Sequence, residues 1–139
     1  MSVIVSACLL GLSCRYDGTA PEISVGIRKL AETEHIIPVC PEQLGGLPTP
    51  RPRAERKGEK ILTEYGEDVN SNFFRGAEEV LKLLELFPVD LAVLKERSPS
   101  CGKNFIYDGS FSGKIVEGQG VLSELLSARG INVISESEL

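Results

Sequence analysis

The chain has 139 residues, of which 42% are hydrophobic and 25% are charged, and its formal net charge at pH 7 is −5. This length and balance fit a single globular domain, residues 1–139, and exclude a disordered chain or a fibrous repeat. The negative charge argues against nucleic acid as a partner, and no apolar run reaches the ~20 residues that a membrane helix needs. We therefore expect a cytoplasmic protein whose thiols stay reduced.

Four short apolar runs predict β-strands. They lie at residues 3–7, 36–39, 91–94 and 131–134. Each run is apolar on both faces instead of alternating, which is typical of parallel strands that helices cover on both sides.

Helical patterns fill the intervals between these strands. Residues 21–31 begin with Pro21, whose missing N–H costs nothing at a helix start. Residues 68–87 place apolar side chains at three- and four-residue intervals after Asp68, a candidate cap. Residues 121–129 end before Gly130, a natural left-handed cap.

This order of elements predicts a three-layer α/β/α sandwich with a mainly parallel four-stranded sheet. Two segments fall outside the alternation. Residues 41–60 contain four of the eight prolines and three glycines, which predicts a long loop. Residues 105–116 resemble a small hairpin, with a turn that begins at Tyr107-Asp108-Gly109.

Three of the four cysteines follow predicted strands. Cys8 and Cys40 come directly after the first and second strands, and Cys101 comes soon after the third. Because ligands of open parallel sheets bind beyond the carboxyl ends of the strands, we expect these three thiols at one rim. Cys14 lies in the loop after Cys8 and could join them, whereas the single histidine, His35, precedes the second strand.

Sulfur-only ligation of this kind favours zinc, copper(I) or an iron–sulfur cluster. Two other interpretations stay open. Cysteines often pack in cores as small hydrophobic residues. One of the thiols could instead be a metal-free nucleophile with a pKa lowered by a nearby cation such as Lys95 or Arg97.

Several blocks of the sequence resemble the DUF523 family, which is related to bacterial thiouracil desulfurases (desulfidases). The blocks are Ser6-Ala-Cys-Leu-Leu-Gly11, Cys14-Arg-Tyr-Asp-Gly18, Pro38-Val-Cys-Pro-Glu42 with Gly45-Gly-Leu-Pro-Thr-Pro-Arg51, Lys95-Glu-Arg-Ser-Pro-Ser-Cys-Gly102, and Ile106-Tyr-Asp-Gly-Ser-Phe-Ser-Gly113. They occur in the same order and cover nearly the whole chain.

The resemblance implies a 4Fe-4S cluster held by Cys8, Cys40 and Cys101, with one iron open to the sulfur of a small thiolated substrate such as thiouracil. Water would then replace that sulfur in a desulfidase reaction. Cys14 could be a fourth ligand that closes the site. The alternative function is therefore a metal-, cluster- or sulfide-binding module without turnover, and zinc is the alternative metal.

The reaction needs a proton acceptor near the water. Glu42 lies two residues after Cys40 and is the candidate general base, and Ser98 and Ser100 precede Cys101 and could orient substrate or water. Each has a simpler interpretation, because Glu42 could be an exposed loop carboxylate and the serines could only cap a turn.

Substrate-binding candidates lie in the same blocks. Asp17 could bind an N–H edge of a pyrimidine, Tyr16 could stack on a planar ring, and Lys95 could bind an anionic group. The basic residues of segment 51–60 are interleaved with glutamates, which favours a solvated flexible segment over phosphate binding.

Overall fold

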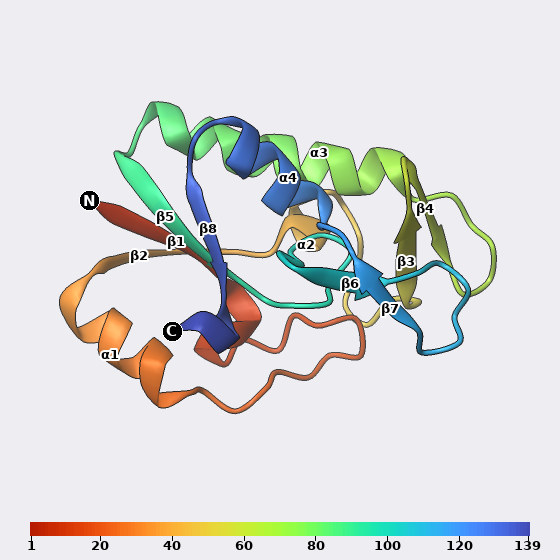
Figure 1. Ribbon diagram of the computed structural model, residues 1–139, viewed down its shortest axis with the longest axis horizontal. Helices are drawn as coiled ribbons and strands as arrows, with labels where there is room; N and C mark the ends of the chain where they lie inside the picture. Colours follow the sequence, from red (N-terminus) through yellow and green to blue (C-terminus); the bar gives the residue numbers. More distant parts are fainter.

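The computed structural model describes residues 1–139 and is built on a four-stranded, fully parallel sheet (Figure 1). Its strands are β1 (Ser2–Ser6), β2 (His35–Val39), β5 (Val89–Leu94) and β8 (Asn132–Ser135), in the order β2-β1-β5-β8. All four were predicted from their apolar runs, with ends that differ by at most two residues.

Helices cover both faces of this sheet. Helix α1 (Val25–Thr33) lies on one face, and α3 (Asn70–Leu81) and α4 (Val121–Ala128) lie on the other (Figure 1). The predicted three-layer α/β/α sandwich is therefore confirmed.

Successive side chains of β1 enter two separate cores, because side chains of a strand alternate between its faces. Val3 and Val5 pack with Ile27 of α1, whereas Ile4 packs with Phe73 of α3 and with residues of α4. A sheet buried on both faces needs apolar residues at every position, which explains the continuous apolar runs.

Two helix boundaries differ from the sequence prediction. Helix α1 begins four residues after Pro21, because the Ser24 side chain accepts a hydrogen bond from the Ile27 amide at 3.2 Å and caps the helix there. The second predicted segment, residues 68–87, is α-helical only from Asn70 to Leu81 and continues as the 3-10 helix η2 (Lys82–Glu85). Gly130 has a φ of +80°, as its predicted capping role requires.

The prediction of a long loop over residues 41–60 was wrong. This segment contains the short helix α2 (Pro41–Leu44) and the antiparallel hairpin of β3 (Ala54–Lys57) with β4 (Lys60–Thr63). Glu55 and Arg56 are buried instead of facing solvent, because Glu55 accepts hydrogen bonds from backbone amides and Arg56 pairs with Glu124. The predicted second hairpin is confirmed as β6 (Phe105–Tyr107) and β7 (Ile115–Glu117).

The short helix α2 touches α3 with no space between their backbones. A Cβ atom added to Gly76 would lie 1.8 Å from the Pro41 carbonyl oxygen, and one added to Gly45 would lie 1.9 Å from that of Asn72. The absence of side chains at these two glycines therefore sets the position of α2, which begins at Pro41, the residue after Cys40.

We expect Gly76→Ala to separate α2 from α3 and to lower the free energy of unfolding by about 3 kcal/mol, because neither backbone can yield locally. Denaturant unfolding measures this difference. Glu78→Ala, on the exposed face of the same helix, is the matched control and should change stability little. Equal stability of the two variants would contradict the close packing.

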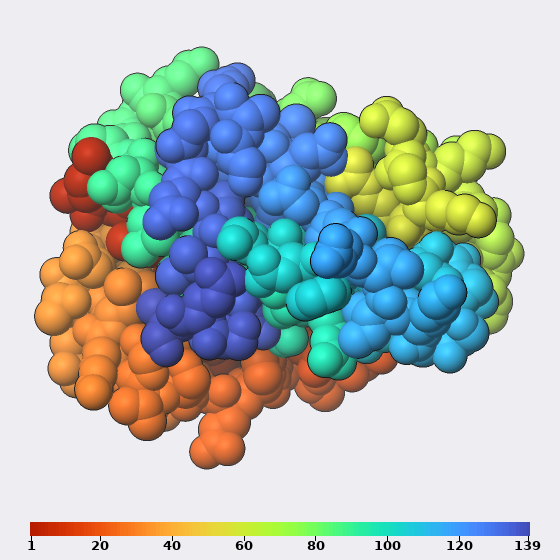
Figure 2. Space-filling model, in the orientation of Figure 1, coloured from red at the N-terminus to blue at the C-terminus, as the bar shows by residue number.

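The end of the chain folds back over the segment that follows β5. Strand β8 leads into the 3-10 helix η3 (Glu136–Glu138), where Glu136 accepts from the Glu96 amide at 2.8 Å and Glu138 from the Asn104 side chain at 2.8 Å. Figure 2 shows these last residues, in dark blue, against the segment near residue 100 and against α1. No helix in the structure is long and apolar enough to cross a membrane.

Candidate functional site

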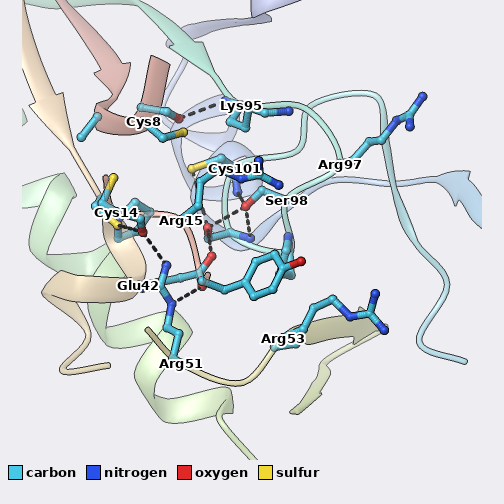
Figure 3. Close-up of a pocket in the computed structure, with 18 of the residues that line it drawn as sticks. Cys8, Cys14, Arg15, Glu42, Arg51, Arg53, Lys95, Arg97, Ser98 and Cys101 are labelled. Atoms are coloured by element: carbon cyan, nitrogen blue, oxygen red, sulfur yellow. Dashed lines mark hydrogen bonds and ion pairs between the residues drawn. The ribbon is translucent and has the colours of Figure 1, made fainter. Parts of the chain in front are cut away.

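A cavity of about 380 Å³ opens beyond the carboxyl ends of β1, β2 and β5 (Figure 3). Its volume is within the range of about 300–1,000 Å³ that is usual for small-molecule sites. Strand β2 lies on one side of β1, and β5 lies on the other. The strand order therefore reverses direction beside β1, and ligands of doubly wound sheets bind at this position.

All four cysteines line this cavity. Cys8 is in the 3-10 helix η1 (Ala7–Leu10) that directly follows β1, and Cys14 is in the loop after it. Cys40 is the residue before α2, and Cys101 is in the loop after β5. The predicted convergence of three thiols at one rim is therefore observed, and Cys14 lies beside them. His35 is at the opposite end of β2, where its Nδ1 contacts the Ser2 hydroxyl at 2.9 Å.

The loop that carries Cys101 is docked on the start of α4. The Val121 and Leu122 amides donate to the carbonyl oxygens of Pro99 and Ser100 at 3.1 and 2.8 Å, and the Ser123 hydroxyl donates to that of Cys101 at 2.7 Å. These bonds satisfy amides that a helix start leaves without partners, and they hold the cysteine rigidly.

Burial raises the pKa of three of the thiols. The pKa of Cys8 is about 11, with Lys95 lowering it in part, and the pKa values of Cys14 and Cys101 are about 12. A metal-free nucleophile would need a lowered pKa, so this alternative finds no support at these three positions.

The donor set suits a cluster of soft metal ions. Four thiols line one cavity, and the only histidine of the chain lies at the far edge of the sheet. No three Cys, His, Asp or Glu side chains lie close enough together to hold a single metal ion. Zinc therefore finds no support here, and thiols are the donors that an iron–sulfur cluster takes.

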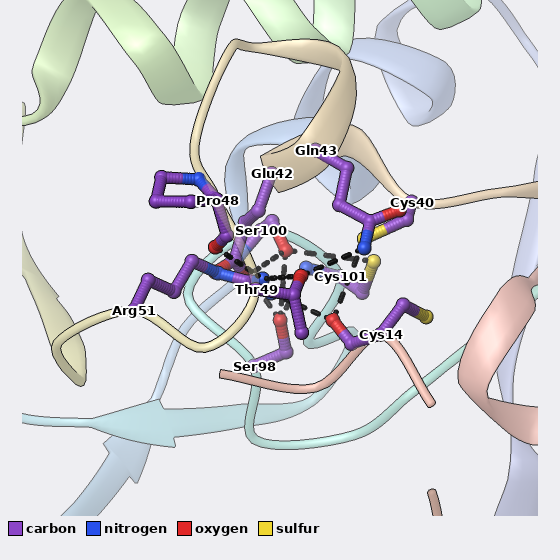
Figure 4. A network of polar contacts seen from close by, with 10 residues as sticks. All are labelled: Cys14, Cys40, Glu42, Gln43, Pro48, Thr49, Arg51, Ser98, Ser100 and Cys101. Carbon is purple, nitrogen blue, oxygen red and sulfur yellow. Dashed lines mark hydrogen bonds and ion pairs between the residues drawn. The ribbon is translucent and has the colours of Figure 1, made fainter. Parts of the chain in front are cut away.

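A polar network lies beside the thiols (Figure 4). Glu42 accepts a hydrogen bond from Arg51 Nε on one carboxylate oxygen at 3.0 Å and from the Ser100 hydroxyl on the other at 2.8 Å. The Ser98 and Ser100 hydroxyls are 2.9 Å apart, and the Ser98 oxygen also accepts from the Cys101 amide at 3.1 Å. Ser98 thus caps the turn, as the simpler interpretation of the serines predicted, and also belongs to the network.

The structure brings two of the three predicted substrate-binding residues to the cavity. Tyr16 and Lys95 line it, and the Lys95 ammonium also pairs with Glu136 at 3.2 Å. Asp17 is not part of the lining, and its carboxylate accepts from the amide and hydroxyl of Thr19 at 3.0 and 2.6 Å. Its observed contacts are those of an ordinary turn aspartate.

Comparison with known proteins identifies the family of this chain. A sequence model of the family described as 2-thiouracil desulfurase matches residues 3–138. The chain belongs to this family. The uncharacterized protein YbbK of Bacillus subtilis (strain 168) is 44% identical over 147 positions, which cover 99% of this chain and 97% of YbbK. A solved structure of the 4Fe-4S-dependent thiouracil desulfidase TudS has a TM-score of 0.94 and 48% identity, covering 99% of this chain and 92% of that one.

Arg51 is the first of two residues in the cavity wall that sequence reasoning missed. Its side chain is only 4% exposed, although the charge pattern of segment 51–60 predicted a solvated chain. The available signal was its position as the last residue of the family-like block that begins with Pro38. Arg53, two residues further on, does face the cavity mouth and is 45% exposed (Figure 3).

Glu96 is a second missed residue, and it organises the loop between β5 and β6. Its carboxylate accepts hydrogen bonds from the amides of Lys103, Asn104 and Phe105 at 2.9, 2.9 and 3.2 Å, and from the Asn104 side chain at 2.8 Å. Partial burial acts to raise the pKa of Glu96, but these donors outweigh it and hold the pKa below its ordinary value.

We expect Glu96→Gln to lower the unfolding free energy by about 1–2 kcal/mol at pH 7, because the charge strengthens each of these bonds. A depressed carboxyl pKa contributes stability above the unfolded-state value, and this contribution is lost as pH falls through the folded-state pKa. The stability difference between wild type and variant should therefore be constant near neutrality and shrink below about pH 4.5. Thermal unfolding between pH 3 and 8 measures it; a constant difference would contradict this origin.

Proposed function

We propose that this protein removes sulfur from a small thiolated compound such as 2-thiouracil, with a 4Fe-4S cluster held by Cys8, Cys40 and Cys101. The observation that carries the proposal is the meeting of these thiols with the Glu42–Ser100 network in one cavity. Membership in the 2-thiouracil desulfurase family and the similarity to TudS, described as 4Fe-4S-dependent, support it. We place the reaction in the cytoplasm, where thiols stay reduced.

When bound, the cluster would supply a soft Lewis acid that draws electron density from the thiocarbonyl through its sulfur. The net change replaces the C=S bond by a C=O bond and consumes one water, with sulfur leaving as hydrogen sulfide. The protein's own groups would have to bind the heterocycle and move the protons of that water.

Glu42 is the proposed general base of this reaction. Its carboxylate lies at the cavity wall, two residues from Cys40, and is held by Arg51 and Ser100 on separate oxygens. A fixed carboxylate can accept a proton from a water positioned next to it. Ser100, hydrogen-bonded to both Glu42 and Ser98, would orient that water or the substrate.

Tyr16 and Lys95 are the proposed substrate contacts. The Tyr16 ring at the cavity wall can stack on a planar heterocycle, and the Lys95 ammonium can face an anionic or carbonyl oxygen. Lys95 is fixed at the end of β5, because its amide donates to the Ser6 hydroxyl at 3.0 Å.

A second function is favoured by Cys14, the fourth thiol of the same cavity. If Cys14 completed the ligand set, no iron would be open to substrate, and the protein would be a cluster-binding module without turnover. The two functions thus differ in the role of a single sulfur.

Anaerobic reconstitution with iron and sulfide, followed by incubation with 2-thiouracil, tests the proposal. We expect a coloured protein with the electron paramagnetic signal of a cluster after reduction, and release of uracil and sulfide in equal amounts. A loaded cluster that releases no sulfide would favour the binding module, and a colourless protein would contradict both.

A further inference from the structure

Arg51 uses every nitrogen of its guanidinium inside the protein. Nε donates to Glu42 at 3.0 Å, one terminal nitrogen donates to the Pro48 carbonyl at 3.2 Å and to the Thr49 hydroxyl at 2.8 Å, and the other donates to the Cys14 carbonyl at 2.9 Å (Figure 4). Its own amide donates to the Tyr16 carbonyl at 2.8 Å. The side chain is therefore held in one orientation by groups on three sides.

These contacts join separate walls of the cavity. Cys14 and Tyr16 belong to the loop after β1, Glu42 belongs to the helix after β2, and Pro48 and Thr49 belong to the loop that carries Arg51. The planar fork of a guanidinium can make such directed bonds at once, whereas the single ammonium of a lysine cannot.

The effect of Arg51 on Glu42 is mainly one of orientation. The Arg51 and Glu42 side chains are 4% and 14% exposed, and the cost of removing such charges from water offsets much of their attraction. With one carboxylate oxygen bound to Arg51 and the other to Ser100, the plane of the carboxylate is set. Loss of the Arg51 contact would leave the Glu42 carboxylate free to rotate about the last bonds of its side chain.

We propose that Arg51 is a positioning residue that acts through Glu42 by aligning its carboxylate with the reacting water. This inference rests on the proposed desulfuration and goes beyond it by assigning a role to a residue outside the ligands and the proton acceptor. A merely structural Arg51 would matter equally whether or not Glu42 carried its carboxylate. A positioning Arg51 matters only when that carboxylate is present.

The test is a double-mutant cycle of wild type, Arg51→Gln, Glu42→Gln and the double variant, each loaded with cluster and normalised to its iron content. Sulfide release from 2-thiouracil gives kcat and KM. Arg51→Gln should lower kcat by about 10- to 100-fold, the size of effect that a misplaced catalytic group causes, with KM changed by less than about 2-fold. In the Glu42→Gln background the same substitution should change kcat by less than about 2-fold.

An equal loss of kcat in both backgrounds would overturn the positioning role while leaving the desulfuration intact. A wild-type protein that holds its cluster and releases no sulfide would overturn the proposed function, and this inference with it. If Arg51→Gln does not load the cluster, the cycle is run with Arg51→Lys, which keeps the charge and loses the fork.

One measurement without turnover and one control variant accompany the cycle. Iron and acid-labile sulfide per chain should be the same in Arg51→Lys as in wild type, because Arg51 contacts no sulfur. Arg75→Gln, an exposed arginine on α3, is the matched control and should leave kcat, KM and iron content unchanged. A loss of iron in Arg51→Lys that accounts for the whole loss of activity would also overturn the proposal.

Discussion

Cys101→Ser is expected to give a folded protein that no longer holds an iron–sulfur cluster. Serine fills nearly the same volume, so the loop docked on α4 should keep its hydrogen bonds from Val121 and Leu122. Its hydroxyl oxygen, however, is a much poorer ligand for iron than a thiolate. After anaerobic reconstitution, iron and sulfide per chain should fall close to zero, while circular dichroism should remain that of the wild type.

Cys14→Ser is the matched variant, because its thiol lines the same cavity and is buried to a similar extent. With three ligands and one open iron, this variant should keep its cluster and release sulfide from 2-thiouracil. If it lost as much iron as Cys101→Ser, the site would be closed by four cysteines, and the proposed open iron would be wrong. Full iron retention by Cys101→Ser would contradict the ligand set itself.

Glu42→Gln is expected to lower kcat by about 10²- to 10⁴-fold, the usual contribution of a general base. The substitution keeps the shape of the side chain and an oxygen that can accept from Arg51, but it removes the proton acceptor. Cluster content should stay at the wild-type level, because the carboxylate is not among the proposed ligands. Steady-state release of sulfide, normalised to iron, measures the effect.

Glu32→Gln, an exposed carboxylate on α1 far from the cavity lining, is the control for this experiment and should leave kcat unchanged. A Glu42→Gln variant with full kcat would exclude a proton-transfer role and leave only a structural one. A variant that lost its cluster would show that Glu42 acts on ligand placement instead.

The apolar runs were sufficient to predict the strands of the parallel sheet, because a strand that is buried on both faces has few polar positions. A second rule, that the carboxyl ends of parallel strands lie at one rim, predicted the meeting of Cys8, Cys40 and Cys101, because each follows one of three adjacent strands. These inferences depend on local sequence and on a general property of parallel sheets, and so they need no knowledge of side-chain packing. Cys14, in contrast, follows no strand, and the sequence placed it only in the loop after Cys8.

The hairpin of β3 and β4 could not be recognised in the same way. Its charged residues look solvated in sequence, but the Glu55 carboxylate accepts from the Gly109 and Phe111 amides, both at 3.0 Å. Arg56 donates to the Gln119 carbonyl at 2.9 Å. These partners lie more than fifty residues away, so the burial of both charges depends on contacts that no local pattern contains.

The sequence by itself determined the strands of the parallel sheet and the helices that cover it, the three strands after which cysteines follow, and the family to which the motifs belong. Only the tertiary structure decided that Arg51 is buried against Glu42, that Ser100 joins the same network, and that Asp17 lies outside the cavity. The reason is physical. Periodicity and strand order act through neighbouring residues, whereas the orientation of the Glu42 carboxylate depends on partners from loops that only folding brings together.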